Sequence, residues 1–229
     1  KNEVIKEAQT RFIKDQRDIL CKSTDLTEPE FEKSMNLAGR ALTEYVLFRQ
    51  KTIDRLKKID KKDQESEIHN ILVPMKRILR SGDFSQDIYI NNTWILDDKF
   101  MTYSTILSDM EMTDLLRELT KDEVIKKDDN RPDIAIIFSD DPKTKDKFDV
   151  VIVELKRKGL KPEDNVRVEV QLEKRARGLY GLYPGKVQSL WLYGVVELDN
   201  DYKSHLSSAG YHPLYSKGNV FVNTNDITV

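Results

Sequence analysis

Two continuous apolar runs limit what this chain can fold into. Residues 134–138 and 150–153 are apolar throughout, and a polar stretch over 139–147 separates them. Short runs of this kind are typical of strands that are buried on both faces of a sheet. The polar stretch therefore predicts a hairpin between two buried strands. The run 189–196 predicts a further buried strand, and Trp94-Ile95-Leu96 predicts a shorter one.

Apolar residues at helical spacing predict helices before and after these strands. They recur three, four or seven residues apart over 2–22, 31–59, 64–72 and 165–182. The second of these helices is expected to begin at an N-cap, an opening proline and a capping-box acid, which are Thr27, Pro29 and Glu30. The order of elements predicts an α/β domain over 61–229 that follows a helical arm over 1–60.

Composition narrows the possible function classes. The 38 Lys and Arg residues nearly balance the 40 Asp and Glu residues of this 229-residue chain, so contacts to a polyanion must come from a local cluster of cations. The single cysteine, Cys21, excludes an intrachain disulfide and a cysteine-based zinc cluster. Without a run of about 18 apolar residues or a signal-like start, we expect a cytoplasmic protein with no membrane partner. The start at Lys1 rather than Met suggests a piece of a longer protein.

Charged residues at the ends of the predicted strands carry the chemistry. Asp133 opens one strand, Glu154 and Lys156 close the next, and residues two apart on a strand share a face, so Glu154 and Lys156 are expected to point the same way. Buried charges are costly unless something uses them. Mg²⁺ or Mn²⁺ would be held by Asp133, Glu154 and the carbonyl of Leu155, while Lys156 orients a water or stabilises the transition state. The alternative is a turn residue at Asp133 and a solvated strand end at Glu154 and Lys156.

Pro132-Asp133, a hairpin and Glu154-Leu155-Lys156 together resemble the signature of the PD-(D/E)xK nuclease superfamily. The resemblance implies the restriction-endonuclease-like fold, a mixed sheet flanked by helices, and a metal-dependent phosphodiesterase with Asp133, Glu154 and Lys156 as catalytic residues. The long interval between Asp133 and Glu154 departs from a compact motif and requires an extended hairpin.

The same resemblance implies two further catalytic residues. The family places an acid on the helix before the sheet, which points to Glu67 as an additional metal ligand, with Asp97 and Asp98 as competing choices. Many members carry a glutamine on the helix after the third strand, which points to Gln171. His69 is expected to be a hydrogen-bonded core residue rather than a catalytic one, and His205 and His212 are expected to have no chemical role.

A block over 91–100, with Ser108-Asp109 beyond it, resembles bacterial members in which the nuclease-like domain ends a long protein. In those members the front of the protein is a histidine-kinase/chaperone-type (GHKL) ATPase region. The resemblance covers roughly residues 40 to 200. It implies an upstream ATPase domain as a partner in the same chain, and it suggests a role in antiviral defence.

A basic cluster follows the predicted site and would contact a phosphate backbone rather than base edges. Besides Lys156 and Arg175, the residues expected to bind nucleic acid are Arg157, Lys158, Lys161, Arg167, Lys174 and Arg177. On the predicted helix, Lys174 and Arg177 are three residues apart and share a face. A solvated charged surface is the alternative interpretation.

Three functions are compatible with these patterns. The first is a Mg²⁺- or Mn²⁺-dependent endonuclease that acts on DNA, with RNA as the alternative substrate. The second is a module that binds nucleic acid or a partner protein without cutting. The third is a structural dimerisation or docking domain, in which the apolar stripe of the helical arm packs against the core, an upstream domain or a second copy of the chain.

Overall fold

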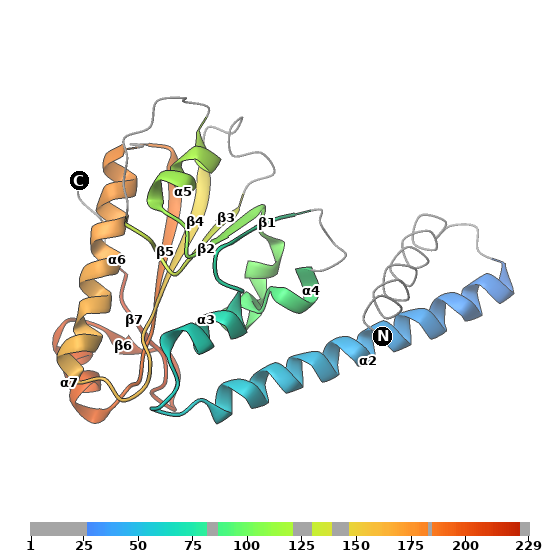
Figure 1. Cartoon of the computed structure of the whole chain (residues 1–229), viewed down its shortest axis with the longest axis horizontal. Helices are drawn as coiled ribbons and strands as arrows, with labels where there is room; N and C mark the ends of the chain where they lie inside the picture. Colours follow the sequence, from blue (N-terminus) through green and yellow to red (C-terminus); the bar gives the residue numbers. More distant parts are fainter. Residues whose placement is uncertain (1–26, 82–86, 121–129, 139–146, 183–184, 225–229) are drawn as a thin grey trace.

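The computed structural model describes residues 27–81, 87–120, 130–138, 147–182 and 185–224. Within them, a five-stranded mixed sheet has helices on both faces, which confirms an α/β fold (Figure 1). The helix predicted over 2–22 lies outside the described residues, and so does most of the predicted hairpin loop.

The strands of the sheet follow one another in chain order. They are β1 (Arg77–Arg80), β2 (Thr105–Ser108), β3 (Ile134–Phe138), β4 (Phe148–Leu155) and β5 (Val187–Val195). Neighbours from β1 to β4 are antiparallel, whereas β4 and β5 are parallel. A parallel pair needs a crossover connection, and helix α6 (Pro162–Leu182) provides it. The strands and the helix predicted for these regions are confirmed.

Strand β4 lies inside the sheet and is covered on both faces, which explains its unbroken apolar sequence. Val151, Val153 and Leu155 pack into a cluster with α3 (Glu65–Leu72). Val150 and Ile152, which alternate with them and point to the other face, pack into a second cluster with α6 and with α5 (Met112–Leu119). The face of each β4 side chain therefore decides which helix it can meet.

The helical arm is the long helix α2 (Glu28–Lys58), which begins after Thr27 as expected. The Glu30 carboxylate accepts hydrogen bonds from the backbone amide and the hydroxyl of Thr27. Near its other end, Arg49 lies against the Trp94 ring and pairs with Asp98, which docks that part of α2 onto the body. The first half projects past the sheet (Figure 1). Five large apolar side chains of α2 are exposed, and they are Phe31, Met35, Leu42, Val46 and Leu47.

The strand expected at Trp94-Ile95-Leu96 is wrong. The structure has a short 3₁₀ turn there, η1 (Thr93–Ile95), followed by η2 (Asp98–Thr102). The Asn91 side chain accepts hydrogen bonds from the amide and the hydroxyl of Thr93, and the Asn92 side chain accepts one from the Trp94 indole. Side chains that bind nearby backbone groups in this way compete with strand pairing.

Several elements had no prediction of their own. Strands β1 and β2 are only four residues each, so they show little periodicity. The remaining elements are α4 (Asp87–Ile90), α5, α7 (Asn200–Ser208) and a small hairpin of β6 (His212–Pro213) and β7 (Phe221–Val222).

Candidate active site

The register of β3 and β4 brings Asp133 and Glu154 opposite each other. Ile134 pairs with Val153, so the next residues along the two strands, Asp133 and Glu154, face one another at the sheet end. Directly opposed residues of antiparallel strands lie on the same face. That face is the α6 side, because Ala135 of β3 and Ile152 of β4 pack into the α6 cluster. The predicted pair of carboxylates is thus adjacent in space.

Asp133 is held by the backbone of the neighbouring strand. Its Oδ2 accepts a hydrogen bond of 2.6 Å from the amide of Leu155. Burial raises the pKa of Asp133 above its ordinary value, and the Leu155 amide and the nearby cations of Lys156 and Arg175 oppose that rise. A partly buried carboxyl with cations nearby is typical of a functional site, and structural ion pairs share this feature.

Glu154 is almost completely buried and is paired with Arg175 from α6. The side chains are 3% and 8% exposed, and Arg175 Nε donates to Glu154 Oε1. Burial raises the pKa of Glu154, and its hydrogen bond and ion pair with Arg175 counteract the rise. Sequence reasoning placed Arg175 in a basic cluster. The sequence does contain a sign that Arg175 is a buried partner of Glu154. Arg175 falls on the apolar face of α6 that Val168, Leu172 and Leu179 form.

Lys156 does not lie beside Glu154 on one face as expected. Its ammonium group donates to the carbonyl of Leu155 at 2.9 Å and lies 3.7 Å from Glu65 of α3, whereas Glu154 pairs with Arg175 of α6. Strand β4 ends at Leu155, so strand alternation does not extend to Lys156. The positive charge of Lys156 nevertheless opposes the rise in the pKa of both Asp133 and Glu154 that burial causes.

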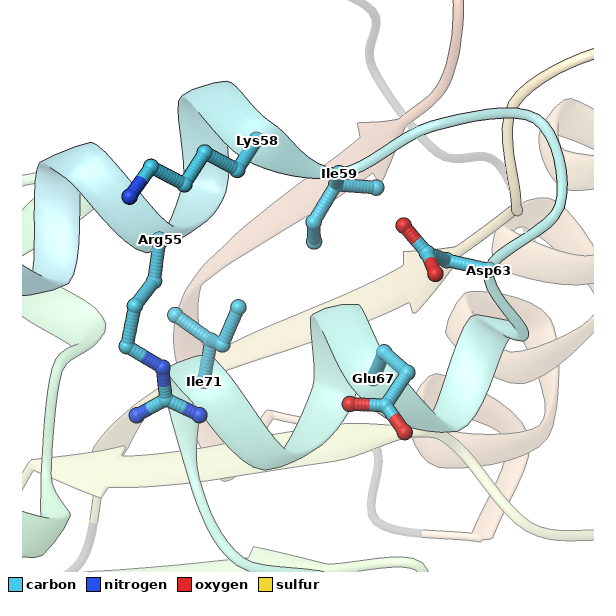
Figure 2. Close-up of a pocket in the computed structure, with 6 residues that line it drawn as sticks. All are labelled: Arg55, Lys58, Ile59, Asp63, Glu67 and Ile71. Atoms are coloured by element: carbon cyan, nitrogen blue, oxygen red, sulfur yellow. The ribbon is translucent and has the colours of Figure 1, made fainter.

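The acid that α3 contributes near this site is Glu65, not Glu67. Burial raises the pKa of Glu65, and the charge of Asp133 adds to the rise while Lys156 opposes it. Glu67 is exposed and lines a pocket between α2 and α3 with Arg55, Asp63 and others (Figure 2). Residues two apart lie on nearly opposite faces of a helix, because each residue turns it by about 100°. Only one of Glu65 and Glu67 can therefore face the site.

Asp97 and Asp98, the competing acids, have structural partners elsewhere. Asp97 caps η2 by accepting from the amide of Lys99, and it also pairs with the Lys99 ammonium group. Asp98 pairs with Arg49 of the arm at 2.7 Å. Both therefore fasten the region around η2.

His69 is a core residue, in agreement with expectation. Its Nε2 lies 2.9 Å from Ser108 Oγ, and burial lowers its pKa. A contact between serine and histidine can activate a nucleophile, but Ser108 is fully buried and no substrate can reach it. His205 pairs with Glu169 at 3.3 Å and stacks on Tyr202, while His212 is exposed in β6.

Gln171 lies one helical turn before Arg175 on α6, so the two side chains share a face. Its Oε1 atom is buried and accepts no hydrogen bond from the described residues. A buried acceptor without a donor is costly, and a water or ligand at this position would satisfy it.

The predicted nucleic-acid contacts do not form one free patch. Arg157 and Lys158 donate to the carbonyls of Lys61 and Ile59, at 3.5 and 2.8 Å, and so hold the link between α2 and α3. The others are exposed cations: Arg167 and Arg177 pair with acids on α6, Lys174 contacts Asn130, and Lys161 precedes the helix.

Two carboxylates with free oxygens fit a hard divalent cation that keeps several waters. Among the described residues, hydrogen bonds occupy Asp133 Oδ2 and Glu154 Oε1, which leaves Asp133 Oδ1 and Glu154 Oε2 for a metal. Leu155 is a weaker ligand than expected because its carbonyl already accepts from Lys156. No group of three His, Cys, Asp or Glu side chains in the described ranges is arranged to hold a metal. Protein ligands would therefore be few.

Comparisons with known proteins add no assignment to this geometry. The described part of the chain contains no helix with the length and apolar character needed to cross a membrane. No family model, no curated protein and no solved structure matches the chain.

Proposed function

We propose that this chain is a metal-dependent endonuclease of the PD-(D/E)xK type that hydrolyses phosphodiester bonds in DNA. The observation that carries the proposal is the opposition of Asp133 and Glu154 at the end of β3 and β4, with Lys156 directly after β4. The mixed sheet with helices on both faces and Gln171 on the crossover helix are compatible with the restriction-endonuclease-like fold.

Each residue of the site has a distinct role in this proposal. Asp133 Oδ1 and Glu154 Oε2 would hold Mg²⁺ or Mn²⁺, which would supply Lewis acidity and offset the negative charge that develops in the reaction. The ammonium group of Lys156 orients the attacking water and stabilises the extra negative charge at phosphorus. The water oxygen bonds to phosphorus and its proton passes to solvent, while the bond from phosphorus to the leaving oxygen breaks and that oxygen takes up a proton from solvent.

Glu65 orients Lys156 in this arrangement rather than binding the metal. It lies 3.7 Å from the ammonium group, and its charge compensates that of the lysine. The exposed cations of α6, Arg167, Lys174 and Arg177, are the contacts we propose for the phosphate backbone.

Incubation of the purified chain with plasmid DNA and Mn²⁺ tests the proposal. Cleavage is expected for the unaltered chain and for Glu67→Gln, whose side chain faces the α2–α3 pocket. Glu154→Gln and Lys156→Met, purified in the same way, are expected to be inactive. Equal cleavage by all four proteins would indicate a contaminant, and no cleavage by any of them would contradict the nuclease function. A single-stranded DNA and an RNA substrate in parallel define the nucleic acid.

A non-cleaving module is the second candidate, and one observation favours it. Arg175 already neutralises Glu154, and Lys156 already donates to the Leu155 carbonyl, as in a structural ion-pair network. Nucleic-acid binding that does not require Mn²⁺, without hydrolysis, would support this function.

A dimerisation role for the arm is the third candidate. Phe31, Met35 and Leu42 follow helical spacing and are each more than half exposed. If a second copy covers them, Leu42→Glu will convert a dimer to a monomer in light scattering. An unaltered mass would contradict the homodimer.

The upstream ATPase partner and the defence role rest on the block over 91–100 alone.

A further inference from the structure

Arg175 is a buried cation in a place where a nucleic-acid contact cannot be made without unpacking the helix. Its side chain is 8% exposed, in contrast to 63% for Arg177, two residues later on α6. A buried charge of this kind is tolerated only with a partner, and Arg175 has two.

The guanidinium group joins three parts of the site. Its Nε donates to Glu154 Oε1 at the end of β4, and its Nη2 donates to the carbonyl of Arg131 at 2.6 Å. Arg131 comes two residues before Asp133, at the entry to β3. One rigid, planar group on α6 therefore fixes the positions of both strands that carry the carboxylates.

The two carboxylates are each fixed through one oxygen. Glu154 is fixed by Arg175, and Asp133 is fixed by the Leu155 amide at 2.6 Å. The orientation of each remaining oxygen follows from these bonds. Partners behind a metal ligand that orient it in this manner contribute substantially to metal affinity.

We propose that Arg175 is the positioning residue of the site, which holds Glu154 so that its second oxygen and that of Asp133 take the same divalent cation. The proposed function supplies the identity of the cation, but the inference concerns binding and does not depend on cleavage. The direction in which cation affinity changes when Arg175 is replaced distinguishes positioning from simple charge repulsion. Coulomb repulsion alone predicts that removing a positive charge near the site strengthens cation binding, whereas loss of positioning predicts that it weakens binding.

Mn²⁺ binding to the full chain, measured by the EPR signal of free Mn²⁺, tests this inference. Arg175→Gln is expected to weaken Mn²⁺ binding about 10- to 100-fold, and Arg175→Lys, which keeps the charge but loses the two-pronged geometry, by a smaller factor. Arg117→Gln is the matched control. It removes an exposed arginine of α5 that pairs with Asp114 and has no role in the proposed site, and it is expected to bind Mn²⁺ like the unaltered chain.

Each other outcome overturns the inference. Binding to Arg175→Gln that is as tight as, or tighter than, binding to the unaltered chain would show that Arg175 competes with the cation or has no influence on it. If circular dichroism shows that Arg175→Gln is unfolded, Arg175→Lys decides, and equal affinity contradicts positioning. Absence of Mn²⁺ binding to the unaltered chain also contradicts it. Arg175-dependent binding without DNA cleavage would overturn only the nuclease function.

Discussion

The end of β3 and β4 and the pocket between α2 and α3 contain the same kinds of charge in different surroundings. The sheet end has two acids, Asp133 and Glu154, and two bases, Lys156 and Arg175. The pocket also has two acids and two bases, Asp63, Glu67, Arg55 and Lys58 (Figure 2). At the sheet end the acids are desolvated and their pKa values are raised. In the pocket, Arg55, Lys58 and Glu67 are exposed to water.

The degree of exposure of the charged groups distinguishes the α2–α3 pocket, which is only a concave surface, from the sheet end, where the charges can take part in chemistry. Exposed charges are screened by water and contribute little to stability or to reactivity. Buried charges are costly, strongly coupled to one another and held in one geometry. The hollow in the surface is thus a weaker guide to function here than the buried pair of carboxylates.

The largest effect is expected on DNA cleavage. Asp133→Asn and Glu154→Gln should each lower the Mn²⁺-dependent rate by roughly a thousandfold or more, because several kcal/mol of charge stabilisation depend on the metal. The corresponding pocket variants, Asp63→Asn and Glu67→Gln, should cleave plasmid at the unaltered rate. If a pocket variant lowered the cleavage rate as much as a sheet-end variant, the sheet end could not be singled out as the active site.

The next effect is on the free energy of unfolding. Arg175→Ala leaves Glu154 buried without its cation, and removal of one partner of a buried pair costs about 3–5 kcal/mol. Arg55→Ala, at the exposed side of the pocket, should cost about 0.5 kcal/mol or less. Urea denaturation measures both values, and equal losses would contradict the distinction between buried and exposed cations.

The two acids of α3 sharpen the comparison within a single helix. Glu65→Gln removes the carboxylate next to Lys156 and should lower the cleavage rate about tenfold, in the range for a residue that orients a functional group. Glu67→Gln should have no effect on it. Rates over a series of Mn²⁺ concentrations separate a loss of turnover from a loss of metal binding. A change in metal affinity alone would assign Glu65 to the metal instead of the lysine.

The smallest effect is on the pH dependence of stability. A carboxyl whose pKa is raised by folding stabilises the protein fully below its unfolded pKa and loses that contribution as pH rises through the folded pKa. The pKa of Glu154 is raised above 4.5, so the stability of the unaltered chain relative to Glu154→Gln should fall as pH increases from that value.

Asp97 provides a control of opposite sign. The amide and ammonium groups of Lys99 lower its pKa below 3.8, so its contribution is present above that value and is lost as pH falls through the lowered pKa. The stability of the unaltered chain relative to Asp97→Asn should therefore fall toward acid. Urea denaturation across this pH range measures both, and slopes of the same sign would contradict the assigned shifts.

Much of the core architecture could be predicted because burial leaves a direct trace in sequence. The runs in β3, β4 and β5 are apolar because helices cover them, and Thr27, Pro29 and Glu30 mark the start of α2 through local hydrogen bonds. The strand predicted at Trp94-Ile95-Leu96 was wrong because the Asn91 and Asn92 side chains accept hydrogen bonds from the Thr93 amide and the Trp94 indole, which favours a turn there.

The site was predictable only along the strands. Alternation and register put Asp133 opposite Glu154. The choice between Glu65 and Glu67 depends on the rotation of α3 against the sheet, and neither charge pattern nor spacing determines that rotation. The partner of Glu154 depends on how α6 packs across β4, so Arg175 was grouped with surface cations although its helical phase matches the buried face.

Two hydrogen bonds connect the end of the helical arm to the sheet end. The side chains of Lys158 and Arg157 donate to the carbonyls of Ile59 and Lys61, in the short link that joins α2 to α3. These two residues directly follow Lys156 in the chain. A displacement of the end of α2 would therefore be transmitted through these two side chains to the segment that directly follows Lys156, while the contact of Arg49 with the Trp94 ring restrains the helix further along.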